Sequence, residues 1–204
     1  MFKNVFIGEN AKNQSKRILI LGESHYQEDE NIDGTDSVVK ALALTGKDTE
    51  KKIMFYKNIM KTFGYDVSSE QRNLFWNKVF CGNYVEQFCG KGKNNTAKYY
   101  VAKNREKYND ALFDFINQNE IDVVFCFSRL VYNNLPCFTK DEKELHLIRH
   151  PQLYLNKFTY RPNCYHKKCT VQLNKPLTVY GLKHPSAYYN YELYFEAIKK
   201  EINV

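Results

Sequence analysis

Long apolar runs are missing from this sequence of 204 residues. The best candidates, Ile18 to Leu21 and Val123 to Phe127, fall far short of the roughly 20 residues that a transmembrane helix needs. The opening residues, MFKNVFIGENAKN, also lack the apolar stretch and the small-residue cleavage site of a secretory signal. We therefore expect a soluble, cytoplasmic protein with no membrane partner.

Cysteine is absent before Cys81, and none of the six cysteines forms a C-x-x-C pair. Six cysteines in an intracellular chain of this size favour reduced thiols over a disulfide framework. One segment does carry residue types that zinc accepts, namely His146, His150, Cys164, His166 and Cys169. Their spacing is not that of a structural zinc site. Surface histidines and free thiols are the favoured interpretation, with zinc as the alternative, and we expect no cofactor.

Acidic residues are absent from two stretches, although the net charge of the whole chain is only +7. Residues 145–191 contain seven Lys and Arg and no Asp or Glu, and residues 87–105 contain five. Tyrosines are interleaved with the basic residues in both stretches. Basic side chains neutralise phosphates and aromatic rings stack on unpaired bases, so this mixture favours a nucleic-acid partner. The alternative is a solvated basic face without a ligand.

Short apolar runs alternate with helix-like segments along the chain, which predicts an α/β fold with a mainly parallel sheet. We expect a single domain over residues 1–204 in three α/β/α layers, with a basic insertion at 136–176. The expected central sheet has four strands, at 17–22, 79–82, 122–127 and 177–181. The expected helices cover 38–44, 51–63, 96–118, 128–135 and 188–202, and a further strand at 145–148 is an option within the insertion.

Functional residues in such folds gather at the carboxyl ends of the parallel strands. Four short stretches follow the four expected strands: GESHY at 22–26, GNY at 82–84, SR at 128–129 and KHPS at 183–186. These stretches are therefore the first candidates for a functional site.

Two of these stretches resemble a known family. GESHY at 22–26 and HPS at 184–186 are similar to the two signature motifs of the uracil-DNA glycosylase superfamily, in the family's order and after the expected first and last strands. Asn83 falls where the family carries an asparagine that reads the flipped base, and the resemblance covers about half of the chain. It implies a monomeric, monofunctional DNA glycosylase that excises uracil or a modified pyrimidine and leaves an abasic site.

The resemblance also implies roles for particular residues. His184 would donate a hydrogen bond to the departing base, and Glu23 would orient the attacking water and offset the positive charge of the sugar. The residues expected to bind the substrate are Gly22, Ser24, Tyr26, Phe80 and Asn83. The residues expected to contact DNA are His25, Pro185, Ser186 and Tyr188, with Tyr188 as the wedge that fills the gap left by the base, together with Lys167 and Lys168.

The first motif departs from the family pattern at Ser24, where many members hold the water with Asp or Asn. This departure leaves a catalytically inactive DNA-binding module of the same fold as an alternative. A second alternative is a serine esterase of the Gly-Asp-Ser type with Ser24 as nucleophile, although Gly181 stands where that family's Asp is expected. Family members with a similar Glu often carry an iron–sulfur cluster, which the lack of early cysteines argues against.

Overall fold

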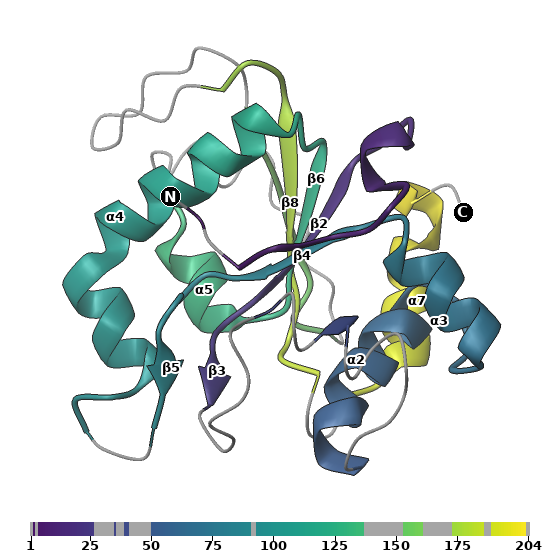
Figure 1. Ribbon diagram of the computed structural model, residues 1–204, viewed down its shortest axis with the longest axis horizontal. Helices are drawn as coiled ribbons and strands as arrows, with labels where there is room; N and C mark the ends of the chain where they lie inside the picture. Colours follow the sequence, from purple (N-terminus) through teal and green to yellow (C-terminus); the bar gives the residue numbers. More distant parts are fainter. Residues whose placement is uncertain are drawn as a thin grey trace.

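The computed structural model describes residues 2, 4–26, 35, 39–40, 50–90, 93–136, 153–160, 173–185 and 189–202. Within these ranges the chain forms an α/β fold around a mixed six-stranded sheet in the order β1-β4-β2-β6-β8-β7 (Figure 1). The strands of this sheet are β1 (Phe6–Ile7), β2 (Ile18–Gly22), β4 (Phe80–Asn83), β6 (Val123–Cys126), β7 (Asn156–Tyr160) and β8 (Leu177–Gly181).

The four expected strands correspond to β2, β4, β6 and β8, which are parallel to one another. The expected total of four strands is wrong, because β1 and β7 add antiparallel edges. β1 is too short to show a periodic pattern. β7 lies within the segment 136–176, and its buried Phe158 and Tyr160 alternate with half-buried residues, as a strand with one buried face requires.

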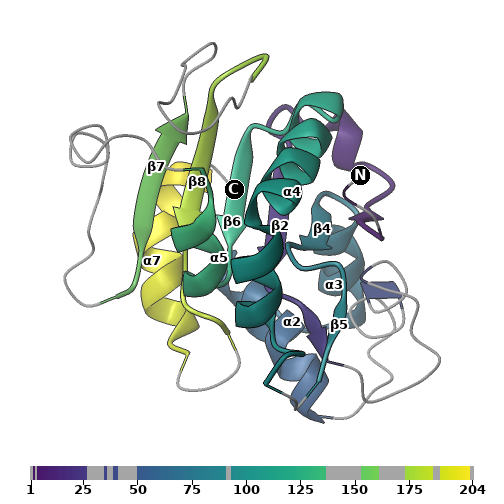
Figure 2. The same ribbon diagram turned by 90° about the vertical axis from the view of Figure 1, so that its left-hand side faces the viewer.

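Helices cover both faces of the sheet in three layers (Figures 1 and 2). One face carries α4 (Ala97–Gln118) and α5 (Arg129–Asn134), and the other carries α2 (Glu50–Thr62), α3 (Ser69–Trp76) and α7 (Tyr191–Ile202). A short 3-10 turn, η1 (Ala11–Asn13), follows β1. The expected helix at 38–44 and strand at 145–148 fall largely or wholly outside the described residues.

Successive side chains of each central strand enter different hydrophobic cores. In β2, Leu19 and Leu21 join the core beneath α4 and α5, whereas Ile20 joins the core beneath α2, α3 and α7. The same alternation places Phe80 in the first core and its neighbour Cys81 in the second. Strands buried on both faces need this continuous run of apolar residues, which is why they could be predicted from the sequence.

Hydroxyl side chains cap the starts of three helices. The hydroxyl of Thr96 accepts a hydrogen bond from the Tyr99 amide at 3.2 Å at the start of α4, and Ser128 does the same for Val131 at 3.2 Å at the start of α5. Helix α3, which the sequence analysis did not predict, begins at a third such cap, Ser68. No helix in the described part of the chain is both long and apolar enough to span a membrane.

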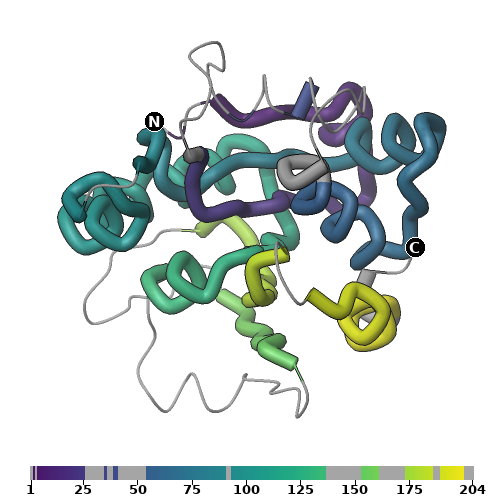
Figure 3. Tube along the Cα trace, turned by 90° about the horizontal axis from the view of Figure 1, so that it is seen from below, coloured from purple at the N-terminus to yellow at the C-terminus, as the bar shows by residue number. Residues whose placement is uncertain are grey.

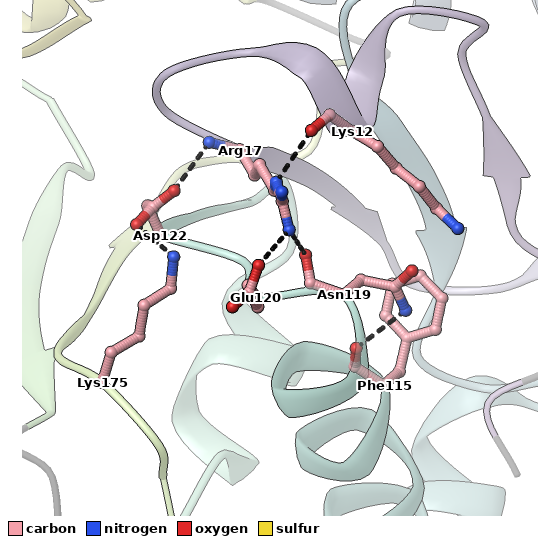
Figure 4. A network of polar contacts seen from close by, with 7 residues as sticks. All are labelled: Lys12, Arg17, Phe115, Asn119, Glu120, Asp122 and Lys175. Atoms are coloured by element: carbon pink, nitrogen blue, oxygen red, sulfur yellow. Dashed lines mark hydrogen bonds and ion pairs between the residues drawn. The ribbon is translucent and has the colours of Figure 1, made fainter.

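A polar network ties together the amino ends of β2, β6 and β8 (Figure 4). Asp122 accepts a hydrogen bond from the Arg17 amide at 2.8 Å and pairs with Lys175 at 2.6 Å. The Arg17 guanidinium pairs with Glu120 at 2.6 Å and donates to the carbonyl of Asn119 at 3.1 Å. These contacts fix the end of the sheet opposite to the carboxyl ends of the parallel strands.

Candidate active site at the carboxyl ends of the parallel strands

The carboxyl ends of the parallel strands β2, β4, β6 and β8 lie at the same end of the sheet. Figure 3 shows the molecule from below. Gly22 pairs with Asn83, and Cys126 pairs with Gly181. Backbone hydrogen bonds continue past the strand ends, from the Val85 amide to the carbonyl of Glu23 at 2.9 Å and from Leu182 to Cys126 at 2.8 Å. The first and second motifs therefore leave the same end of the sheet, from β2 and β8, with β6 between them. A separate two-stranded sheet of β3 (His25–Tyr26) and β5 (Phe88–Cys89) lies at this end of the main sheet.

Gly22 is confined by the side chain of Asn83. A Cβ atom at position 22 would lie 2.2 Å from Oδ1 of Asn83 and 3.7 Å from Cζ of Phe55. The glycine thus allows the Asn83 amide to lie across the end of β2, next to a ring that α2 supplies. An amide and an aromatic face together are what recognition of a planar base requires.

Glu23 is held by groups on both sides. Its backbone carbonyl is bonded to Val85, and its Oε2 accepts a hydrogen bond of 2.7 Å from the hydroxyl of Ser128. Ser128 is 1 % exposed and caps α5. The carboxylate of Glu23 is therefore oriented by the element that follows β6.

His184 follows β8 and packs against Phe55, with the two ring centroids 5.1 Å apart. Burial lowers the pKa of His184, and the negative charge of Glu23 opposes this shift without reversing it. The imidazole is accordingly neutral at neutral pH and can donate a hydrogen bond. The ring of Phe55 lies next to both His184 and the Cα of Gly22, so the ends of β8 and β2 meet around this ring.

Helix α2 holds the backbone next to His184. The buried side-chain amide of Asn58 donates a hydrogen bond of 2.7 Å to the carbonyl of Pro185. One turn later, the Thr62 hydroxyl lies 2.9 Å from the hydroxyl of Tyr189 and also donates to the carbonyl of Asn58 at 2.7 Å. Pro185 itself is buried. Helix α2 thus contacts the chain at Pro185, in the second motif, and again at Tyr189.

Ser24 and His25 of the first motif contact neighbouring parts of the chain. The hydroxyl oxygen of Ser24 is buried and has no hydrogen-bond partner among the described residues. The His25 ring packs against Phe88 with centroids 5.9 Å apart, and its Nε2 lies 3.0 Å from the hydroxyl of Thr35. Burial lowers the pKa of His25 to about 4. Tyr26 pairs with Cys89 through its backbone.

Phe80 does not line the site, contrary to the expectation from the sequence. It lies at the start of β4, is fully buried, and packs edge-on against Phe115 of α4 with centroids 6.0 Å apart. The alternation along β4 directs Phe80 to the face opposite to Phe55. The aromatic ring next to Gly22 and His184 is that of Phe55, from α2.

Several expected residues lie outside the described part of the chain. They are Ser186, Tyr188, Lys167 and Lys168, together with the zinc candidates His146, His150, Cys164, His166 and Cys169. Within the described residues, no group of three or more His, Cys, Asp or Glu side chains is arranged to hold a metal ion. The described thiols, Cys81, Cys89 and Cys126, are free and buried, and burial raises the pKa of Cys81 and Cys126 to about 12.

The described cations of the two basic stretches do not all lie at the end of the sheet that carries the candidate site. Lys175 lies at the amino ends of the strands, where it pairs with Asp122. The cations of the stretch 87–105 lie on and before the first half of α4, where Lys93, Lys98, Lys103 and Arg105 are exposed. Helix α4 bends at Asn104, and a polar hollow of about 580 Å³ opens there between residues 101–107 and Asn134. Among these described cations, Lys175 therefore does not adjoin the candidate site.

The sequence analysis missed two residues that shape the site, Phe55 and Asn58, and the contact between Ser128 and Glu23. Asn58 and Thr62 are polar residues on the buried face of an amphipathic helix, which is a signal for a specific hydrogen bond. The SR stretch at 128–129 is a candidate from the sequence, but the hydrogen bond from Ser128 to Glu23 joins residues 105 positions apart. No sequence pattern encodes such a long-range pairing.

No protein-family model matches the chain. No curated protein sequence matches it either.

Proposed function

We propose that this protein is a DNA glycosylase that flips a uracil or modified pyrimidine out of DNA and hydrolyses its N-glycosidic bond. The observation that carries the proposal is the convergence of Glu23, Asn83 and His184 at the ends of three parallel strands, beside the ring of Phe55. The two motifs that resemble the uracil-DNA glycosylase superfamily supply Glu23 and His184.

The chemistry of the reaction matches these side chains. The bond breaks through an oxocarbenium-like sugar, while the base leaves as an anion. Glu23 holds a water and offsets the charge of the sugar. Neutral His184 donates a hydrogen bond to the base oxygen on which negative charge develops. Asn83 reads the edge of the base and Phe55 supports its face, in the role first assigned to Phe80. Tyr26 excludes a 5-methyl group, and Tyr188 fills the gap in the stack.

The geometry favours this function over the esterase alternative. A serine nucleophile needs an accessible hydroxyl within hydrogen-bond reach of a base. The hydroxyl oxygen of Ser24 is buried and unpartnered among the described residues, and the neighbouring His25 is engaged with Thr35. Ser24 is better explained as a small residue that lets the chain turn between Glu23 and β3.

A panel of oligonucleotides tests the proposal against an inactive DNA-binding module. Single- and double-stranded DNA carrying uracil, thymine or modified pyrimidines is incubated with the protein, treated with alkali, and the released bases are identified by mass spectrometry. Release of a pyrimidine with alkali-sensitive strand breaks supports the glycosylase. Tight binding without release from any substrate favours the inactive module.

A further inference from the structure

Ser128 makes two hydrogen bonds through one hydroxyl group. It accepts from the Val131 amide at 3.2 Å and donates to Oε2 of Glu23 at 2.7 Å. Because a hydroxyl has a single proton, the bond to the helix amide leaves that proton for the carboxylate. The start of α5 thereby fixes the direction of the bond to Glu23.

This arrangement constrains the expected water-holding residue from both ends. The backbone of Glu23 is anchored to the segment after β4 through Val85, and its carboxylate is anchored to the segment after β6 through Ser128. A glutamate has three side-chain torsions, and each unfixed torsion lowers the fraction of time in a productive geometry. With Oε2 bonded to Ser128, the other carboxylate oxygen is available to the water.

We propose that Ser128 is a positioning residue of the glycosylase, which orients the carboxylate of Glu23 toward the attacking water. This inference rests on the proposed function. It assigns a role to the SR stretch after the third parallel strand, for which the family resemblance supplies none. Ser128 touches neither base nor sugar and acts only through Glu23.

Two substitutions separate positioning from helix capping. Ser128→Ala removes both hydrogen bonds, whereas Ser128→Thr retains the hydroxyl. Ser68→Ala is the matched control, because Ser68 caps α3 through Gln71 at 3.3 Å and has no contact with the site. We expect Ser128→Ala to lower the single-turnover rate by roughly 10-fold or more, the equivalent of a hydrogen bond to a charged group. Ser128→Thr restores most of the rate, Ser68→Ala leaves it unchanged, and all three keep the wild-type affinity for DNA.

The decisive measurement is a double-mutant cycle of single-turnover rates with Glu23→Gln. If Ser128 acts through Glu23, adding Ser128→Ala to Glu23→Gln lowers the remaining rate by less than about 2-fold. Equal effects of Ser128→Ala in both backgrounds, or a wild-type rate in Ser128→Ala alone, overturn the positioning role while the glycosylase stands. A wild-type protein that releases no base from any substrate overturns the proposed function and, with it, the role of Ser128.

Discussion

The side-chain oxygen of Asn83 occupies the space that a Cβ atom on Gly22 would need, with only 2.2 Å between the two positions. The end of β2 therefore accepts no side chain while Asn83 keeps its place. Glycine is required here by the approach of a neighbouring side chain and not by an unusual backbone angle. Residues 22 and 83 form one unit of the candidate site.

Replacing Gly22 by Ala should displace the Asn83 amide and lower the rate of base release by roughly 10²-fold, the scale of a 1 Å misplacement in an active site. Gly82→Ala is the matched control, because its Cβ would meet the ring of Phe2 at 2.9 Å on the other face of the sheet. That variant should lose stability and keep its rate per folded molecule. If Gly22→Ala and Gly82→Ala release the base at comparable rates, the position of Asn83 does not matter for substrate recognition.

Phe55→Ala should lower base release by about 10-fold to 100-fold, because stacking of one base on an aromatic ring contributes about 1–3 kcal/mol. The neighbouring Met54 is 44 % exposed on the same helix, so Met54→Ala controls for changes in α2. Single-turnover kinetics on one substrate measure both variants. If Phe55→Ala works as fast as Met54→Ala, the ring of Phe55 has no contact with the base.

His25 should make the protein less stable as the pH falls. Its pKa is about 4 in the folded state and about 6.5 in the unfolded chain, so between these values only the unfolded chain binds the proton. The free energy of unfolding should fall by up to about 1.4 kcal/mol per pH unit in this window from this group. Urea unfolding at pH 7, 6 and 5 should show a smaller decrease in His25→Gln. If the free energy of unfolding decreases equally in the wild type and in His25→Gln, His25 is exposed to solvent and its pKa is not lowered by burial.

Asp122→Ala should destabilise the protein without slowing base release, because its contacts lie at the far end of the sheet. The lost bond to the Arg17 amide accounts for about 1–3 kcal/mol. The pair with Lys175 adds little, since the Lys175 side chain is 37 % exposed and water screens it. Glu196→Ala, which breaks an exposed pair with Lys199, should leave the unfolding free energy within about 0.5 kcal/mol of wild type. Slower base release by the Asp122→Ala variant would contradict this prediction and show that the two ends of the sheet are coupled.

The central strands could be predicted from the sequence because each is a run of apolar residues buried on both faces, as in Leu19 to Leu21. The cap at Thr96 and the start of a helix at Ser128 could be predicted because helix starts are set by local interactions. β1 and the pair β3–β5, of two residues each, carry no periodicity. Phe55 escaped prediction for a different reason: its role depends on how α2 docks near β2, and docking is a property of the tertiary structure.

The most direct test compares single-turnover base release by the wild type, Glu23→Gln and His184→Ala on one substrate, with DNA binding measured in parallel. In the proposed mechanism, the two residues act on opposite ends of one transition state. Each substitution should therefore lower the rate by roughly 10²-fold or more, the scale of losing a positioned general base or oxyanion donor, with little change in affinity. A Glu23→Gln protein that releases the base at the wild-type rate would contradict the account.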